Sequence, residues 1–323
     1  MSSIGDIILT TPILKKLKLK YPEIKIDFLV LEKFKDAIEG ISYIENVIVF
    51  DKQKHDGIKN MKKLAEKLNN NSYDYVFDLH SKIRSIYICK FIKSKILKYK
   101  KRVWYKSLLV KMKIMKYNVD ASIVKNYFEP FKILGLKYEK EDLDFYFSPS
   151  ELGKIPENYK NIPIFAPCAS KETKEWTIEG FGELARIIGE EKKEKIILIG
   201  GKSDYEKCEK INLISGNNCI NLAGKLTLKE SAALLSCGKY LLSNDSGPFH
   251  ISRGVKTPTF VIFGPTDSNM FELESRDTLI TLKEPCSPCS LHGDKKCPKQ
   301  HFNCMKKLKA ETVFEIIEKK QEE

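Results

Sequence analysis

The sequence predicts an α/β protein built from two doubly wound domains, each a largely parallel sheet covered by helices on both faces. Short apolar strand candidates alternate with amphipathic helical patterns along nearly the whole chain, as in parallel sheets. The length of 323 residues allows two hydrophobic cores. A stretch with two prolines, a glycine and little periodicity separates the halves. We therefore expect an N-terminal domain over residues 1–150, a linker over 151–161 and a C-terminal domain over 162–323.

Strand and helix candidates follow one another in both halves. In the first half the strand candidates are Ile24–Val30, Val47–Phe50 and Tyr75–Asp78, and the helix candidates are Ile13–Lys20, Ile58–Leu68 and Arg84–Ile92. In the second half the strand candidates are Ile162–Ala166, Lys195–Ile199, Cys219–Leu222, Tyr240–Ser243 and Thr259–Phe263, and the helix candidates are Ile178–Gly189, Asp204–Ile214 and Leu228–Ser236. Ligands of open α/β sheets bind beyond the carboxyl ends of the strands, so the loops there are the candidate site.

The start of the chain is unusual for this class of fold. Residues 1–6 read as the loop that follows a first strand, although no strand candidate precedes them. A doubly wound domain opens with a strand at the centre of its sheet. We therefore expect the N-terminal domain to lack its first strand, about five to seven apolar residues, and to be weakened at its middle. A start codon assigned too far downstream or a truncated chain would explain the loss.

Composition excludes several classes of protein. With 42% hydrophobic and 31% charged residues, the chain is typical of a soluble globular protein and not of a disordered one. Its apolar runs are far shorter than the roughly 20 residues of a membrane span, and no signal peptide pattern precedes them. Nine cysteines at irregular spacing argue against a secreted disulfide framework. We expect a cytoplasmic protein.

Basic residues are concentrated in one segment. Residues 79–119 contain 13 lysines and arginines, among them Lys82 and Arg84, and no acidic residue. Apolar and aromatic side chains alternate with these cations. Such a segment suits an anionic membrane face or an acidic substrate. The alternative is a set of solvated helix faces in a lysine-rich protein.

Two neighbouring strands of the second half end in polar, glycine-containing loops. Asp245, Ser246 and Gly247 follow one strand, and a helix that carries His250 is expected to begin at Pro248. The next strand ends in Gly264-Pro265-Thr266. Loops of this kind offer backbone N–H groups and a helix N-terminus to an anion. The plainer alternatives are that Asp245 only caps the helix and that the histidine belongs to the core.

Two other segments carry candidate chemistry. Asp6 either caps a turn, with Thr11 capping a helix that begins at Pro12, or acts as a general base at the edge of a sheet. In the loop that follows the strand ending at Ala166, the Ser170 hydroxyl and the Lys174 ammonium are groups that hold a diphosphate. A capped surface loop with a solvated lysine is the alternative there.

The C-terminal region contains a cluster of cysteines. Cys286, Cys289, Cys297 and Cys304 fall within 19 residues, and prolines and a glycine bend the chain between them. A zinc site of four thiolates usually has two close pairs, and only the first two cysteines have that spacing. His292 and His301 are substitute ligands. The pattern leaves open a structural metal, free thiols or oxidation-prone pairs.

Four motifs occur together and in order. They are Ser2-Ser3-Ile4-Gly5-Asp6 with Thr11-Pro12, Tyr75–His80 with Arg84-Ser85, Ala169-Ser170 with Lys174 and Trp176, and Asp245-Ser246-Gly247 with His250 and Phe263-Gly264-Pro265-Thr266. Over nearly its whole length the chain thus resembles the bacterial lipopolysaccharide heptosyltransferases, glycosyltransferase family 9. The resemblance implies a GT-B architecture, in which two Rossmann-like domains face a central cleft. It also implies an inverting transfer, with acceptor on the N-terminal domain and sugar nucleotide on the C-terminal one.

The same resemblance implies a role for each motif. Asp6 would be the general base, and Ser3, Lys82 and Arg84 would bind the acceptor. Ser170 and Lys174 would hold the donor diphosphate. Asp245 would bind hydroxyls of the transferred sugar; the remaining donor-site residues would be Ser246, Gly247, His250, Gly264 and Thr266. No cofactor would be needed for catalysis, and the cysteines would hold at most a structural zinc.

The implied partners are an ADP-heptose donor and an anionic acceptor, the inner core of lipopolysaccharide on lipid A. The enzyme would then be a cytoplasmic monomer, peripheral on the inner face of the inner membrane, with no nucleic-acid partner. Two other functions stay open at this point. One is a GT-B enzyme with another nucleotide sugar, such as a nucleotide-sugar epimerase. The other is a basic nucleic-acid-binding protein with a zinc cluster, suggested by the net charge of +13, although it explains neither the α/β halves nor the Asp245 loop.

Overall fold

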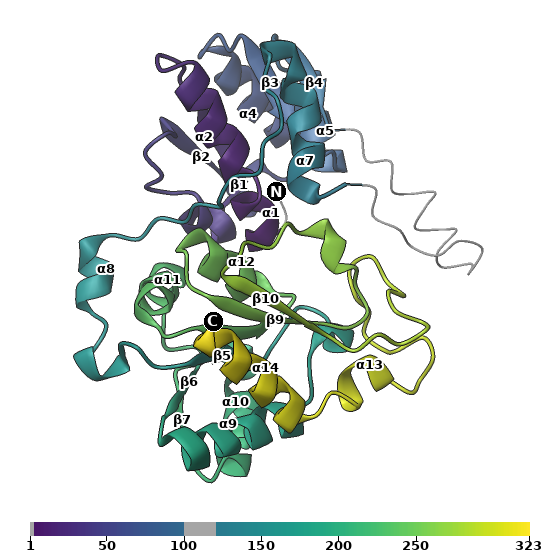
Figure 1. Cartoon of the computed structure of the whole chain (residues 1–323). Helices are drawn as coiled ribbons and strands as arrows, with labels where there is room; N and C mark the ends of the chain where they lie inside the picture. Colours follow the sequence, from purple (N-terminus) through teal and green to yellow (C-terminus); the bar gives the residue numbers. More distant parts are fainter. Residues whose placement is uncertain (1–2, 100–120) are drawn as a thin grey trace. The chain divides into compact units, whose positions relative to one another are not determined.

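The computed structural model describes residues 3–99 and 121–323, and these form two compact units. The first unit contains residues 3–99 and 121–143, and the second begins at Asp144 (Figure 1). The second unit therefore begins well before residue 162, where the C-terminal domain was expected to begin, and it includes the expected linker, 151–161. This linker is not irregular throughout, because helix α8, Pro149–Gly153, overlaps its start and a short 3-10 helix, Glu157–Tyr159, lies within it.

A six-stranded parallel sheet forms the centre of the second unit, in the order β10-β9-β8-β5-β6-β7. Its strands are β5 Ile164–Ala166, β6 Ile196–Leu198, β7 Cys219–Asn221, β8 Leu241–Asn244, β9 Thr259–Phe263 and β10 Asp277–Thr281. Counted along the unit, the strand order is 3-2-1-4-5-6 read from β7, the doubly wound arrangement that the sequence predicts. The first strand, β5, lies at the centre between β6 and β8.

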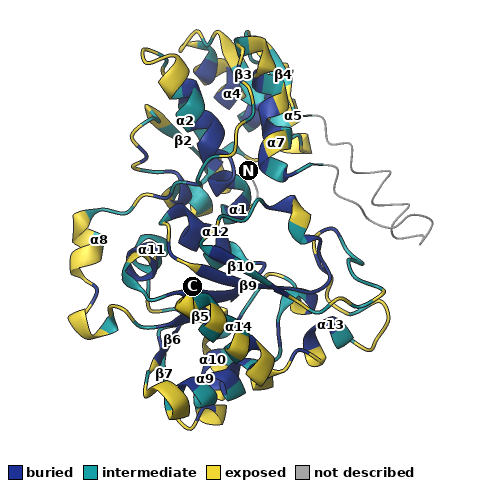
Figure 2. Cartoon of the chain, viewed as in Figure 1, coloured by how far each residue is buried: buried dark blue, intermediate teal, exposed yellow. Residues whose placement is uncertain are grey.

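Apolar burial explains why these segments form strands. Every residue of β5, β6, β8 and β9 is buried (Figure 2), as expected where helices cover both faces of a parallel sheet. Besides α8, the α-helices described in this unit are α9 Ile178–Lys192, α10 Tyr205–Ile214, α11 Leu228–Cys237, α12 Gly247–Gly254, α13 Asn303–Lys306 and α14 Ala310–Glu322. Phe165, Phe181 and Trp176 pack together in its core.

The first unit contains two separate two-stranded parallel sheets. One pairs β1, Asp27–Leu31, with β2, Asn46–Phe50, and the other pairs β3, Tyr75–Asp78, with β4, Lys95–Lys98. The α-helices described in this unit are α1 Ile4–Ile8, α2 Thr11–Lys20, α3 Lys52–His55, α4 Ile58–Asn69, α5 Ile83–Lys90 and α7 Ile123–Phe128. Helix α4 buries Met61, Leu64 and Leu68 against the strand residue Phe50.

The first two helices follow one another closely. Ser3 caps α1, because its hydroxyl accepts the backbone N–H of Asp6 at 3.1 Å. The expectation that Thr11 caps the second helix is wrong. Thr10 occupies that position, and the Thr11 hydroxyl instead donates to the carbonyl of Ile8 at 2.7 Å. Both threonine hydroxyls thus donate to carbonyls at the end of α1, and Thr10 makes no side-chain capping bond to α2.

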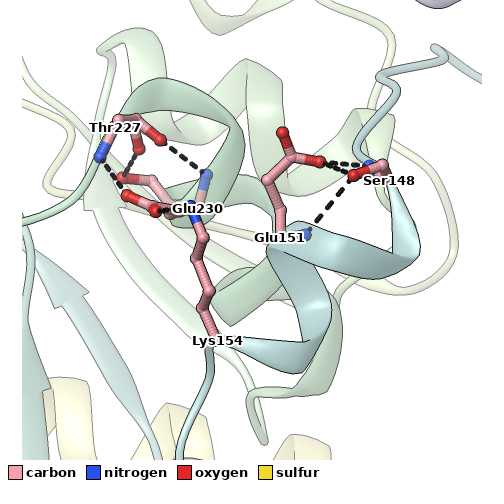
Figure 3. Close-up of polar contacts among 6 residues, drawn as sticks. Ser148, Glu151, Lys154, Thr227 and Glu230 are labelled. Carbon is pink, nitrogen blue, oxygen red and sulfur yellow. Dashed lines mark hydrogen bonds and ion pairs between the residues drawn. The ribbon is translucent and has the colours of Figure 1, made fainter.

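Two reciprocal capping boxes stabilise helices α8 and α11 (Figure 3). Thr227 and Glu230 satisfy each other's backbone N–H groups, and Lys154 of the α8 turn lies 2.8 Å from the Glu230 carboxylate. The Lys154 ammonium, followed by Thr227, lowers the pKa of Glu230 from 4.5 to about 2.

We expect Glu230→Gln to remove a pH-dependent part of the stability. Since the pKa of Glu230 is lower in the folded chain, its contribution is fully present above pH 4.5 and is lost as the pH falls to about 2. Chemical denaturation between these pH values should therefore give wild type a steeper loss of stability on acidification than the variant. Equal slopes for the two proteins would contradict the assignment.

Candidate functional site

Three side chains from different loops meet at the carboxyl edge of the six-stranded sheet. Lys174 follows β5, Asp245 follows β8 and Thr266 follows β9. The Lys174 ammonium lies 2.5 Å from Oδ2 of Asp245, and the Thr266 hydroxyl donates to the same oxygen at 3.0 Å. The Asp245 and Lys174 side chains are only 4% and 13% exposed. The predicted convergence of these loops is therefore confirmed, and it produces a partly desolvated cation beside a carboxylate.

Asn244 holds the loop that carries Lys174. Its side-chain amide donates to the carbonyl of Pro167 at 2.7 Å, and its oxygen accepts the backbone N–H of Trp176 at 2.9 Å. One buried side chain thus ties both ends of the loop over residues 167–176 to the end of β8. This role was not predicted from the sequence. It depends on the complete burial of an asparagine at a strand end, and burial is not visible in the sequence.

Within this loop, Ser170 is exposed, whereas neighbouring residues make contacts with the body of the unit. The Glu175 carboxylate accepts the backbone N–H of Ala169 at 2.9 Å and pairs with Lys207 of α10 at 2.7 Å. The Cys168 thiol hydrogen-bonds with Cys208, and this contact, followed by burial, raises its pKa. The loop is therefore anchored on its inner side and presents Ser170 to solvent.

Helix α12 begins two residues after Asp245 in the sequence. Ser246 is its N-cap residue and makes no side-chain capping bond; its hydroxyl lies 3.0 Å from that of Ser243. The backbone N–H groups at the start of a helix carry partial positive charge and attract anions. Gly247 is the first helical residue, so the backbone there is not screened by a side chain.

His250 is buried, with its ring against Phe249 and Phe271. Burial, followed by the charges of Arg253 and Lys174, holds its pKa well below 6.5, so the ring is neutral near pH 7. Its Nδ1 atom makes no hydrogen bond with any described residue. The residue is thus neither an exposed ligand group nor a fully satisfied core histidine.

The Cys-rich tail contacts two of the loops that form the site. Asp294 exchanges hydrogen bonds with Thr173, next to Lys174, and the Thr173 hydroxyl donates to the Asp294 carbonyl at 2.8 Å. The Cys289 backbone N–H donates to the carbonyl of Pro265 at 2.9 Å, and the Ser287 hydroxyl donates to Gly264. The tail therefore positions the Lys174 loop and the Gly264–Thr266 loop together, and Gly264 is close to Cys304 and Met305.

All four cysteines of the tail line one cavity of about 10 Å³, together with His301. The Cys286 sulfur lies 3.8 Å from Nε2 of His301. Burial, followed by neighbouring cysteines, raises the pKa of Cys289 to about 11. Among the described residues, no three Cys, His, Asp or Glu side chains stand in an arrangement that could hold a metal ion. The structural zinc therefore stays a prediction.

Metal analysis of the purified chain tests that prediction. If the four cysteines hold a structural zinc, the purified chain should contain about one zinc, bound at residues 286–304. Cys286→Ser combined with Cys289→Ser should abolish it, whereas Cys237→Ser, outside the tail, should leave it unchanged. Zinc-free protein whose tail cysteines all react with a thiol reagent would contradict the prediction.

Asp6 and Ser3 lie in the first unit, at the start of α1. Burial, followed by the charge of Asp6, raises the pKa values of Tyr99 and Tyr127, so both phenols lie within electrostatic reach of this carboxylate. Asp6 itself is half-buried and lies in the first turn of α1.

After β3, Lys82 is the N-cap residue of α5, and Arg84 lies in the first turn of that helix. The guanidinium of Arg84 pairs with both carboxylate oxygens of Asp56 at 3.1 Å, and both side chains are nearly half exposed. Residues 100–120, which contain much of the expected basic segment, lie outside the described residues. No helix of the described chain has the length and apolar character needed to cross a bilayer.

Comparisons with known proteins show the family to which the chain belongs. The sequence profile of glycosyltransferase family 9 (heptosyltransferase) matches residues 61–301. The chain is 31% identical to lipooligosaccharide heptosyltransferase 2 of Campylobacter jejuni (serotype O:6) over 250 residues, 75% of each protein. It is 25% identical to the lipopolysaccharide core heptosyltransferase OpsX of Haemophilus influenzae over 271 residues, which cover 81% of this chain and 77% of that protein.

Solved structures share the fold over nearly the whole length. The E. coli ADP-heptose lps heptosyltransferase II aligns with a TM-score of 0.78 and 17% identity, covering 99% of this chain and 96% of that one. A family 9 glycosyl transferase from Veillonella parvula aligns with a TM-score of 0.80 and 22% identity, covering 98% and 94%. These alignments confirm the GT-B class for the two α/β units. The chain therefore belongs to glycosyltransferase family 9 and is a glycosyltransferase.

Proposed function

We propose that the chain transfers a heptose from ADP-heptose to the inner core of lipopolysaccharide, with inversion at the anomeric carbon. The observation that carries the proposal is the cluster of Lys174, Asp245 and Thr266 at the carboxyl edge of the second sheet. The cation can bind phosphate, and the adjacent carboxylate can bind hydroxyl groups. This pair therefore suits a sugar diphosphate better than a simple anion that carries no sugar. The names of the relatives support heptose as the sugar and a lipopolysaccharide core as the acceptor.

The donor site divides into a phosphate side and a sugar side. The Lys174 ammonium, the Ser170 hydroxyl and the N–H groups at Gly247 bind the diphosphate, since all three donate to anions. Among the described residues, Lys174 and Thr266 both contact the Asp245 carboxylate at Oδ2, and we assign Oδ1 to a hydroxyl of the sugar. Neutral His250 and the Gly264–Thr266 loop complete the pocket.

Asp6 is the general base of the proposed reaction. It accepts the proton of the acceptor hydroxyl while that oxygen bonds to the anomeric carbon, and the bond from that carbon to the diphosphate oxygen breaks with its electron pair. The ADP that leaves gains negative charge, which Lys174 offsets. Ser3, Lys82 and Arg84 bind the anionic acceptor, and Arg84 exchanges its exposed Asp56 partner for an acceptor phosphate. The acceptor's lipid would bring the enzyme to the cytoplasmic face of the inner membrane.

Isothermal titration with ADP-heptose, ADP and UDP-sugars tests the donor assignment. ADP-heptose and ADP should bind to the purified chain, and UDP-sugars should bind at least about tenfold more weakly, which corresponds to about 1.4 kcal/mol. Tight binding of a UDP-sugar without binding of ADP-heptose would favour a GT-B enzyme with another donor.

A further inference from the structure

Gly293 lies in the Cys-rich tail, where the chain passes against the loop that carries Lys174. The residue is buried, and its φ of +73° is in the left-handed region that favours glycine. A Cβ atom at this position would lie 2.8 Å from Cγ and 3.3 Å from Cδ of Lys174, and 3.0 Å from Cβ of Lys171. Ordinary contacts between carbon atoms are about 3.5–4.0 Å long. The Lys174 stem thus occupies space that only a glycine at residue 293 leaves open.

The stem of Lys174 has little freedom to move away from residue 293. Its Cγ atom is close to the backbone and follows it. That backbone forms a short 3-10 helix, Glu172–Lys174, in which the Lys174 N–H donates to the carbonyl of Lys171 at 2.9 Å. At the other end of the side chain, the ammonium lies 2.5 Å from Oδ2 of Asp245. The side chain is therefore held at both ends, and its middle passes Gly293.

The residue after Gly293 attaches the tail to the same 3-10 helix. The backbone N–H of Asp294 donates to the Thr173 hydroxyl at 2.7 Å, and this hydroxyl donates to the Asp294 carbonyl at 2.8 Å. The Thr173 N–H donates to the same carbonyl at 3.2 Å. Because Thr173 is buried, withdrawal of the tail would leave its polar groups unsatisfied. All three bonds use main-chain atoms of Asp294, so they do not depend on its side chain.

The other end of this tail segment is attached to the loop that carries Thr266. The backbone N–H of Ser290 donates to the carbonyl of Pro265 at 2.9 Å. Thr266 and Lys174 both contact Oδ2 of Asp245. The segment therefore connects the two loops on either side of one carboxylate oxygen, and its glycine lies at the contact with the cation.

We propose that Gly293 is a positioning residue of the donor site, which holds the Lys174 ammonium where it meets the donor diphosphate. The proposal rests on the proposed function, in which Lys174 binds that diphosphate. A Cβ at residue 293 would displace the Lys174 stem by about 0.7 Å before it reached ordinary contact distance. Groups of a binding site must be held to within about 0.5 Å of their productive positions. One added methyl group thus displaces the cation and removes no group that contacts the donor.

Isothermal titration with ADP on Gly293→Ala and two control variants tests the proposal. Gly293→Ala should weaken ADP binding at least about fivefold, a substantial part of the loss expected when the cation itself is removed. Gly216→Ala controls for backbone strain, because φ there is +69° and a Cβ would meet nothing within 4 Å. Asp294→Ala controls for a change in the tail and retains the main-chain bonds to Thr173. Both controls should bind ADP as tightly as wild type.

Two further variants separate positioning from general damage to the fold. Gly293→Asn should lose as much ADP affinity as Gly293→Ala, because asparagine tolerates a left-handed backbone but carries the same Cβ. It also replaces Gly293→Ala in the comparison if the alanine variant does not fold. In Lys174→Ala the long stem is absent, so the added Gly293→Ala should weaken ADP binding by less than about twofold.

Three results would overturn the proposal. They are wild-type ADP affinity in Gly293→Ala, wild-type affinity in Gly293→Asn, which would leave only backbone strain, and an undiminished effect of Gly293→Ala when Lys174 is already alanine. Titration with UDP separates the proposal from the choice of donor. If wild type binds UDP and not ADP, the ADP assignment fails, but the same ratios among the variants should appear with UDP, because Lys174 contacts the diphosphate and not the base. A chain that binds neither nucleotide overturns both.

Discussion

Replacement of Asp6 by alanine should lower kcat at least about 100-fold, which is the smaller end of what a positioned general base contributes. The backbone N–H of residue 6, which donates to Ser3, is retained in the variant, so α1 keeps its cap. The affinity for ADP-heptose should not change, because the donor groups Lys174 and Asp245 belong to the other unit. Steady-state kinetics combined with donor titration measures both quantities.

Asp36→Asn is the matched control for this variant. Asp36 is an exposed carboxylate of the same unit, and its loss changes the net charge by the same amount. It should leave kcat near the wild-type value. If Asp6→Ala keeps near-normal turnover, or if the control is equally slow, Asp6 is not the base and its charge acts only through the general field of the unit.

Lys174→Ala should weaken binding of ADP about 10- to 100-fold, because hydrogen bonds to charged groups contribute roughly 1.5–3 kcal/mol. It should also destabilise the second unit, since Asp245 remains buried and loses its 2.5 Å ion pair. Isothermal titration and thermal unfolding measure the two effects separately. Lys210→Ala, which removes an exposed lysine of α10, is the control and should change neither.

A double variant separates binding from stability. In Lys174→Ala with Asp245→Ala no buried carboxylate is left unpaired, so thermal stability should recover relative to the single variant. Affinity for ADP should stay low, because the cation is still absent. Recovery of ADP affinity in the double variant would mean that Lys174 only neutralises Asp245 and does not hold the diphosphate.

The strands that the sequence predicts are those with continuous apolar runs. β5, β6, β8 and β9 are buried on both faces, and that burial demands the apolar pattern from which they were predicted. β4, Lys95–Lys98, and β10, Asp277–Thr281, were missed because their apolar runs are too short. Each has only two successive apolar residues, and lysines or threonines flank them.

The sequence predicts which loops form the site, but not which side chains contact one another there. Glycines and polar residues that follow predicted strands indicated the loops of Lys174, Asp245 and Thr266. Their shared contact at Asp245 Oδ2 depends on the order of the strands in the sheet, which alternation alone does not give. The same limit hid Asn244, whose partners lie some 70 residues away in sequence.

Heptose transfer to a defined acceptor is the reaction that the proposed function requires. The purified chain is incubated with ADP-heptose and a lipid A that carries the inner-core sugars preceding heptose, and the product is analysed by mass spectrometry. We expect an acceptor heavier by one heptose residue, release of ADP, and product formation at least about 100-fold slower with Asp6→Ala. An unchanged acceptor with ADP-heptose, together with sugar transfer from a UDP-sugar by the same preparation, would contradict it.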